Sequence, residues 1–511
     1  MISIYLWLGL VITFWIYILW TRRKFYILYF KLPGPMGYPL IGMAHRLSQR
    51  EDIIHEFNEH EKIYGSLFVS WLGPFPFLIV SEPQIAQDVL TSPYCVDKGF
   101  NYDALDDGTG RGLFSLRNPE WSKHRKLLNP AFGHNVLLSF MPTFNNAVNE
   151  LMEDLDILQG RGELDLSTVL QKFTLNVATL TTMGGNAVYQ DNGQHTKESL
   201  LQSYQCVLEA LTKMCFTPWI RYRVIHWLLG DYRSYAKAKH EIHNFVRRMI
   251  NEKLELSTKA SKSDLELASS NMESNTSDIK KNKKNCFIDI AIDLFKKGDF
   301  TWKNIEDESN VIVFGAFETT ANTLNYTLML LAMFPKYQQK AFEEINTIFP
   351  QRDNFEVSYE DIQQMVYMDM VLNETMRLIA PVPLIARQSS QDFPLSNGII
   401  VPKGVQIAID IFNMHRRKDI WGPDACVFNP DNFLPSNMAD KHSYAFIPFT
   451  KGIRNCIGWR YALISIKVTL ARVLRKYRLT TNFNFHDLYF IEDITVKLRK
   501  TPLLELHLRE A

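Results

Sequence analysis

The chain has 511 residues, of which 46% are hydrophobic and 22% charged, so a large buried core is feasible. Its formal net charge of +1 excludes a global field that would gather nucleic acid or acidic partners, and no nucleic-acid partner is predicted. The six cysteines are scattered and form no C-x-x-C pair, which indicates a reducing compartment rather than a disulfide framework.

Residues 1–24 are predicted to be a membrane anchor. Met1–Trp20 carries no charged residue, and a helix of about 20 apolar residues crosses a bilayer core. Arg22, Arg23 and Lys24 follow at once, which favours a cytoplasmic location for the rest of the chain. A cleaved secretory signal is the alternative, but it needs a positive stretch before the apolar run and a small-residue cleavage site after it, and both are missing.

The next segments alternate between breaks and regular structure. Residues 25–40 are predicted to be a proline-rich elbow, because three prolines and two glycines interrupt Leu32–Pro39. Ser66–Ser81 predicts two strands around Gly73-Pro74, and helical periodicity dominates from about residue 83 to 253. Residues 257–285 are rich in Ser, Asn, Lys and Glu, and are predicted to be a disordered surface loop. Binding of an acidic partner to its basic end is the alternative.

A long helix is predicted after this loop. Thr301 is a suitable N-cap, and Pro335 stops the pattern. The middle of this helix, Val311–Thr323, is uncharged except for Glu318. A lone carboxylate in such a stretch requires a partner or a function.

The segment Phe449–Gly458 matches the pattern F-x-x-G-x-R-x-C-x-G in full. With this segment the sequence resembles the cytochrome P450 family. Gly452 allows a backbone turn, and Gly458 allows the following helix to approach a porphyrin closely. Cys456 lies just before that helix and is predicted to be the thiolate ligand of a haem iron, as this family implies. Phe449 belongs to the same cofactor-binding segment, and Arg454 is predicted to pair with a haem propionate.

Two further motifs fit the same family. Glu374 and Arg377 fit its E-x-x-R helix and are predicted to form a structural ion pair. Arg387 falls where the family often has an arginine that binds a propionate. Trp121 and Arg125 fit its W-x-x-x-R helix, where the i, i+4 spacing directs an indole N–H and a guanidinium to one propionate. A basic patch of Lys123 and Lys126 on that helix is a candidate docking surface for an acidic electron donor, although a solvated helix face is the commoner explanation.

The long helix carries the segment Gly315–Thr320, which resembles the oxygen-activation segment of the family. Glu318 and Thr319 are the predicted catalytic pair, with Thr319 holding a hydrogen-bonded water and Glu318 helping to supply protons. An ordinary helix-interior Glu318 paired with a neighbour is the alternative.

Three residues depart from the usual pattern. Gly315 and Ala316 reverse the common Ala-Gly order, which puts in doubt the local distortion of the long helix that receives dioxygen in the family. Many insect relatives have a glutamate in place of Gly315 that esterifies the haem, so haem without that ester is predicted here. Asn432 stands where the family commonly has arginine, so a third charge beside Glu374 and Arg377 is missing or replaced.

The resemblance covers nearly the full chain and is greatest to insect members of the microsomal branch that includes fatty-acid omega-hydroxylases. It implies a mainly helical P450 fold with a smaller β portion, with residues 41–511 as the haem-thiolate catalytic domain. It also implies insertion of one oxygen atom from O2 into an apolar substrate, at the cytoplasmic face of the endoplasmic reticulum membrane. Electrons would come from NADPH through NADPH-cytochrome P450 reductase, with cytochrome b5 as a second candidate partner. A haem-thiolate isomerase or dehydratase and a non-catalytic haem-binding relative are the alternatives, and substrate identity stays open.

Overall fold

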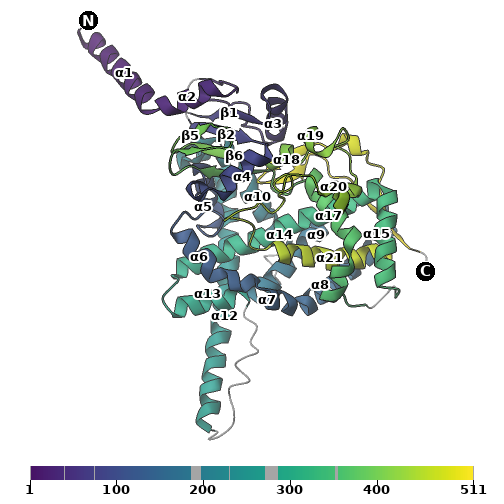
Figure 1. Ribbon diagram of the computed structural model, residues 1–511. Coiled ribbons are helices and arrows are strands. Elements are labelled where there is room, and N and C mark those ends of the chain that lie inside the picture. The colour runs from purple at the N-terminus through teal and green to yellow at the C-terminus, as the bar shows by residue number, and fades with distance from the viewer. Residues whose placement is uncertain are drawn as a thin grey trace.

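The computed structural model describes residues 2–38, 41–73, 75–185, 197–229, 231–270, 286–351 and 355–509. The chain is mainly helical with small sheets, in agreement with the fold class that the sequence predicts (Figure 1). The helices are α1 (Ile2–Thr21), α2 (Arg23–Lys31), α3 (Arg50–Tyr64), α4 (Pro83–Thr91), α5 (Asp103–Thr109), α6 (Glu120–Leu128), α7 (His134–Ser139), α8 (Met141–Leu158), α9 (Ser167–Ala178), α10 (Lys197–Phe216), α11 (Arg223–Leu228), α12 (Tyr232–Ser270), α13 (Phe287–Lys296), α14 (Trp302–Met333), α15 (Pro335–Ile348), α16 (Tyr359–Gln364), α17 (Val366–Leu378), α18 (Ile411–Met414), α19 (Lys418–Trp421), α20 (Pro435–Met438) and α21 (Trp459–Lys476).

The largest sheet has the strand order β1 (Leu67–Leu72), β2 (Phe75–Val80), β6 (Gln406–Asp410) and β3 (Leu384–Gln388). The first two strands form the predicted hairpin, whose turn places Gly73 at φ +61°. Strand β2 runs parallel to β6, and β3 runs antiparallel to β6. Smaller pairs are β4 (Phe393–Pro394) with β5 (Ile400–Val401), β7 (Tyr477–Thr480) with β10 (Glu505–Leu508), and β8 (Phe490–Asp493) with β9 (Thr495–Leu498).

Helix α14 crosses the middle of the body with α21 beside it (Figure 1). The side chain of Thr301 caps its first turn by accepting a hydrogen bond from the backbone N–H of Asn304, and Pro335 begins the next helix. Its 32 residues give a length of about 48 Å. The amino-terminal half packs in one hydrophobic cluster and the carboxy-terminal half in another, so the helix joins the two halves of the core.

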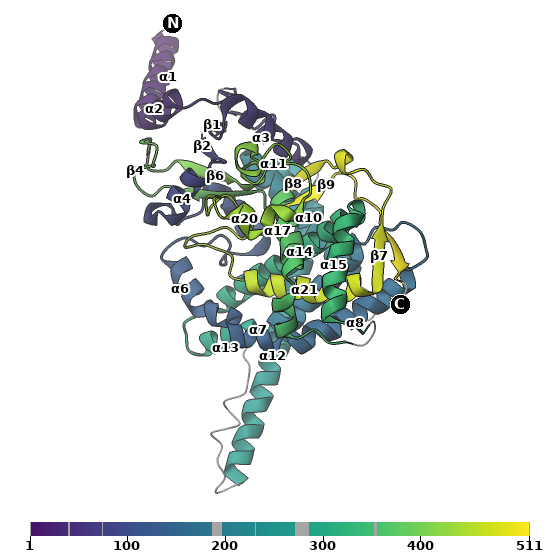
Figure 2. The ribbon, with the colours of Figure 1, turned by 45° about the vertical axis from the view of Figure 1, so that its right-hand side comes forward.

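Helix α1 projects away from the body (Figures 1 and 2), and its described side chains are exposed. Within the described ranges, no helix combines the length and apolar character that a membrane crossing requires. The anchor role of residues 1–24 therefore stays a prediction.

The predicted elbow is shorter than residues 25–40. Residues 25–31 belong to α2, because Phe25, Leu28, Tyr29 and Leu32 form an apolar stripe at helical spacing that packs on the cluster around the large sheet. Residues 33–37 are not helical, as the prolines require.

The prediction of a disordered surface loop at residues 257–285 was wrong for residues 257–270. Helix α12 continues to Ser270 and projects from the body (Figure 1). No glycine or proline interrupts this stretch, and its Lys, Glu, Leu and Ala residues favour a helix despite the polar composition. Residues 271–285 lie outside the described part of the chain.

Candidate active site

The segment Phe449–Gly458 forms a tight loop directly before α21. The backbone N–H of Cys456 donates to the carbonyl of Phe449 at 3.0 Å, which closes the loop. Gly452 lies at φ +80°, and a Cβ there would come within 2.1 Å of the carbonyl oxygen of Leu90. Both the conformation and the space therefore require glycine at position 452. A Cβ on Gly458 would meet nothing closer than Phe132 at 4.0 Å, so contacts within the described polypeptide leave room at that position.

Cys456 lies near two cationic side chains. Burial raises the pKa of its thiol, and the backbone N–H of Gly458 and the charges of Arg125 and Lys98 offset only part of that rise. These groups favour the thiolate, which is the form that binds a metal. The chemistry of this position fits a thiolate ligand.

Two more cations, Arg454 and Arg387, gather with Lys98 beside this loop, and Asp97 is the only carboxylate paired with any of them in the described structure. Arg454 has side-chain atoms Nε and Nη1 that are buried and have no hydrogen-bond partner in the described structure, and its nearest carboxylate, Asp97, lies 3.7 Å from Nη2. Burial and the neighbouring charge of Arg387 lower the pKa of Arg454 to about 9. Burial likewise lowers the pKa of Arg387 and, with the two arginines beside it, that of Lys98 to well below its usual value.

Such a cluster of buried positive charge is unfavourable unless an anion joins it. A group with carboxylates would satisfy the free N–H groups of Arg454 and offset the charge of Arg387 and Lys98. The residues present therefore fit a haem with its two propionates.

Helix α6 contributes the predicted pair Trp121 and Arg125. The indole of Trp121 is buried, and the guanidinium of Arg454 stacks on its ring at 4.3 Å. Arg125 donates from Nη1 to the carbonyl of Asn455 at 3.0 Å and from Nη2 to its side-chain oxygen at 3.1 Å. The structure thus brings both residues to the Cys456 loop.

The middle of α14 is open at three positions. Gly315 is exposed and Ala316 and Thr319 are half-buried, although the residues around them are buried. Outside the chain neighbours of Gly315 and the nearby backbone of its own helix, no described atom lies within 4 Å of a Cβ placed on it. The hydroxyl of Thr319 donates to the carbonyl of Gly315 at 3.0 Å. The small residues therefore leave free space beside this hydroxyl, as a bound cofactor and oxygen would need.

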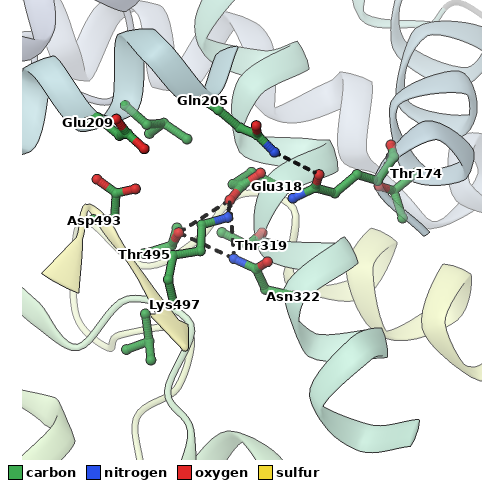
Figure 3. A network of polar contacts seen from close by, with 12 residues as sticks. Thr174, Gln205, Glu209, Glu318, Thr319, Asn322, Asp493, Thr495 and Lys497 are labelled. Atoms are coloured by element: carbon green, nitrogen blue, oxygen red, sulfur yellow. Dashed lines mark hydrogen bonds and ion pairs between the residues drawn. The ribbon is translucent and has the colours of Figure 1, made fainter. Parts of the chain in front are cut away.

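Glu318 has different neighbours from those that its predicted role suggests. Its side chain is 2% exposed and accepts hydrogen bonds from Lys497, from Asn322 at 3.3 Å and from Thr495 at 3.4 Å (Figure 3). In the described structure none of its hydrogen bonds goes to Thr319. The alternative of a helix-interior glutamate paired with a neighbour thus describes its resting contacts.

The Glu374–Arg377 pair is fully buried, with both side chains 0% exposed. Arg377 donates to the two carboxylate oxygens at 2.6 and 2.8 Å and to the carbonyls of His415 and Ala425 at 2.8 and 2.6 Å. Asn432 supplies a neutral donor to Glu374 at 3.1 Å. A neutral amide therefore replaces the third charge that the family commonly has at this place.

The family model described as "Cytochrome P450" matches residues 32–491 of the chain. The chain belongs to the cytochrome P450 family. Among its relatives, "Probable cytochrome P450 313a4" of Drosophila melanogaster is 58% identical over 99% of both chains. "Cytochrome P450 4c21" of Blattella germanica is 30% identical over 93% of both chains. Membership gives the P450 fold, a haem-thiolate cofactor and haem monooxygenase chemistry.

Three residues of this P450 site escaped the sequence analysis. Lys98 and Lys497 gave no local signal, because their partners are distant in the sequence. His124 lies inside the W-x-x-x-R motif and is buried, with Nδ1 at 2.7 Å from Glu308 of α14. The cluster Glu306–Glu308 near the start of the long helix offered the only hint of such a partner.

Proposed function

We propose that this P450 inserts one oxygen atom from O2 into an apolar substrate, with electrons from NADPH delivered by a separate reductase. The observation that carries the proposal is the buried thiol of Cys456 beside three cations that share a single carboxylate, Asp97, in the described structure. In this proposal the thiolate of Cys456 ligates the haem iron. Arg454, Arg387, Arg125 and Trp121 hold the propionates, and Lys98 adds a further charge. The haem, when bound, supplies the activation of dioxygen.

The polypeptide supplies position and protons. The hydroxyl of Thr319, free on the side away from its bond to Gly315, holds a water next to the reacting site. Glu318 supplies protons to that water. The buried pair Glu374–Arg377 fixes α17 against the segment that leads to the Cys456 loop, because Arg377 binds carbonyls of residues 415 and 425.

Aromatic side chains near Gly315 support an apolar substrate. The rings of Tyr204 and Phe317 lie 4.9 Å apart, and Phe314 lies 6.4 Å from Tyr204. Tyr204 belongs to α10, and Phe314 and Phe317 belong to α14. Apolar walls with few polar groups are typical of sites for apolar ligands.

Two exposed surfaces are suited to the partners of this activity, one to an electron donor and one to lipid. Lys123 and Lys126 are exposed on α6, on the helix that also holds Arg125, so an acidic reductase or cytochrome b5 that docks there approaches the Cys456 loop. Helix α1 exposes Trp7, Phe14 and Trp20 by 71%, 61% and 63%, and we propose that it holds the protein in lipid of the endoplasmic reticulum. Resistance of the full-length protein to carbonate extraction from microsomes tests this attachment.

The decisive experiment is the reduced carbon monoxide spectrum of the purified protein. We expect the band of a thiolate-ligated haem in the wild type and its loss in Cys456→Ser. Substrate-induced spin-state spectra over a panel of lipids and foreign compounds then identify the ligand class, and product formation with NADPH and reductase tests turnover. A thiolate band that survives in Cys456→Ser refutes the ligand assignment, and NADPH-independent product favours an isomerase.

A further inference from the structure

A polar cleft of about 610 Å³ lies beside α14, between α3, α9, α10 and the hairpin β8–β9. Its lining includes Arg50, Glu209, Asn322, Asp493, Lys497 and Arg499. Most of these side chains carry charge, so the cleft suits water and ions rather than an apolar substrate. It is therefore distinct in character from the aromatic region near Phe317.

Lys497 links this cleft to the core of α14. Its side chain is 22% exposed and donates from Nζ to Glu318, whose own side chain is 2% exposed. Lys497 and Asn322 line the cleft, and both contact Glu318, which is not itself among the lining residues. Figure 3 shows the side chains of Lys497, Asn322 and Thr495 converging on Glu318. Lys497 therefore both lines the cleft and contacts the buried carboxylate.

A second carboxylate, that of Asp493, lines the same cleft. Asp493 is 6% exposed and accepts hydrogen bonds from Arg50 at 3.2 Å and from Thr212 at 3.1 Å. Burial raises the pKa of Asp493 to about 6, and the charges of Arg50 and Lys497 oppose that rise. Asp493 can therefore exchange protons with solvent near neutral pH. The charged groups that face the path from all sides are Arg50, Glu51 and Asp52 of α3, Glu209 of α10, Glu318 of α14, Asp493 of β8, Lys497 of β9, and Arg499.

We propose that Lys497 is a positioning residue that supplies Glu318 with protons from the water of this cleft. The Lys497 ammonium gives one proton to the Glu318 carboxylate, and the resulting amine takes one proton from cleft water. No electron moves, and the net change is one proton transferred from solvent to Glu318. The inference rests on the proposed function, in which Glu318 supplies protons during monooxygenation.

A purely structural ion pair is the competing explanation, and two substitutions separate the two. Lys497→Arg keeps a positive charge near Glu318, but a guanidinium does not release its proton in proteins. Lys497→Met removes both the charge and the proton. If the ion pair is purely structural, Lys497→Arg should retain the wild-type rate of product formation. If Lys497 relays protons, both variants should lose most of that rate. Arg499→Gln is the matched control, because Arg499 lines the same cleft and its guanidinium stacks on Tyr489 at 5.5 Å.

The first measurement uses turnover of the holoenzyme with reductase. We expect Lys497→Arg and Lys497→Met to lower the rate of product formation at least about tenfold at neutral pH, with a changed pH profile, since positioned proton transfer contributes about 100-fold or more. Arg499→Gln should match the wild type. Wild-type yield and pH profile in Lys497→Arg would overturn the relay.

The second measurement needs no turnover. Reductive ¹³C-methylation of the folded protein labels lysines that water reaches, and the signal of Lys497 is identified by its loss in Lys497→Arg. We expect the chemical shift of this signal to change in Glu318→Gln, because the substitution removes the carboxylate that accepts the hydrogen bond from Lys497. An unlabelled Lys497, or a signal that stays unchanged in Glu318→Gln, overturns the inference. If the wild type forms no oxygenated product, the proposed function fails, and a signal that still changes in Glu318→Gln then identifies a structural pair.

Discussion

Replacing Glu374 with glutamine should destabilise the protein strongly, because the substitution leaves the guanidinium of Arg377 buried without a counter-charge. Both side chains are 0% exposed, and the two hydrogen bonds between them are 2.6 and 2.8 Å long. Breaking a buried pair by removing one charge costs about 3–5 kcal/mol. A typical protein unfolds with about 5–15 kcal/mol, so this loss is a large part of the total.

Removing the cation should cost more than removing the anion. Arg377→Met leaves the Glu374 carboxylate unpaired and also deprives the carbonyls of His415 and Ala425 of donors. Each buried group left without a hydrogen bond adds about 1–3 kcal/mol. The wild type should therefore have the highest free energy of unfolding, Glu374→Gln a lower one and Arg377→Met the lowest.

The assay is urea unfolding followed by tryptophan fluorescence, with Lys62→Met as the matched control. Lys62 and Glu59 have the same i, i+3 spacing and a 2.7 Å contact, but their side chains are 69% and 43% exposed. Exposed pairs contribute little to stability, so this control should not change the unfolding midpoint measurably. If Glu374→Gln unfolds at the same urea concentration as Lys62→Met, the reasoning about the buried pair is refuted.

Three further predictions address the loop, a buried acid and the cofactor. Gly452→Ala should lower the free energy of unfolding of the apoprotein by at least about 1–2 kcal/mol and reduce its haem content, because Gly452 has a positive φ and a Cβ there would collide with Leu90. The control Gly458→Ala should leave the unfolding of the apoprotein unchanged, because a Cβ there meets nothing nearer than 4.0 Å. Burial and nearby acids raise the pKa of Glu492 to about 8. The folded protein therefore keeps a proton that the unfolded chain releases above about pH 4.5, and the stability of the folded state falls as the pH rises from about 4.5 to about 8. Glu492→Gln should remove that part of the fall, and parallel stability-versus-pH curves for the two proteins would contradict this. Denaturing extraction should release all haem from the polypeptide, because Gly315 has no side chain to form an ester; haem that stays attached in mass spectrometry would contradict this.

Local patterns predicted backbone structure correctly where that structure depends on neighbours in the sequence. The turn at Gly452, the cap at Thr301 and the stop at Pro335 each follow from the conformational preferences of single residues, and the structure has all three. The i, i+3 spacing of Glu374 and Arg377 likewise placed both charges on one helix face. The sequence did not indicate that the pair is fully buried, because burial depends on the segments that cover it.

The errors arose where composition and tertiary contacts compete with local patterns. Residues 257–270 have the polar composition of a loop, but they also have good helix formers and no breaker, and they continue α12. Glu318 and Lys497 lie 179 positions apart, and only the return of the chain through β9 brings them together. Lys98 was missed for the same reason, since its neighbours Arg387 and Arg454 come from β3 and the Cys456 loop.

The neutral amide at Asn432 has a physical explanation in the charge balance of the buried pair. Glu374 already has one cation, Arg377, at hydrogen-bond distance, so the pair is neutral as a unit. Its oxygen Oε1 accepts further hydrogen bonds from the backbone N–H of Asn429 at 2.8 Å and from the side chain of Asn432 at 3.1 Å. A second guanidinium here would give the buried cluster a net positive charge, whose desolvation is unfavourable without another anion. Asn432 completes the hydrogen bonding of the carboxylate and leaves the cluster neutral, so the departure from the family pattern does not leave Glu374 short of donors.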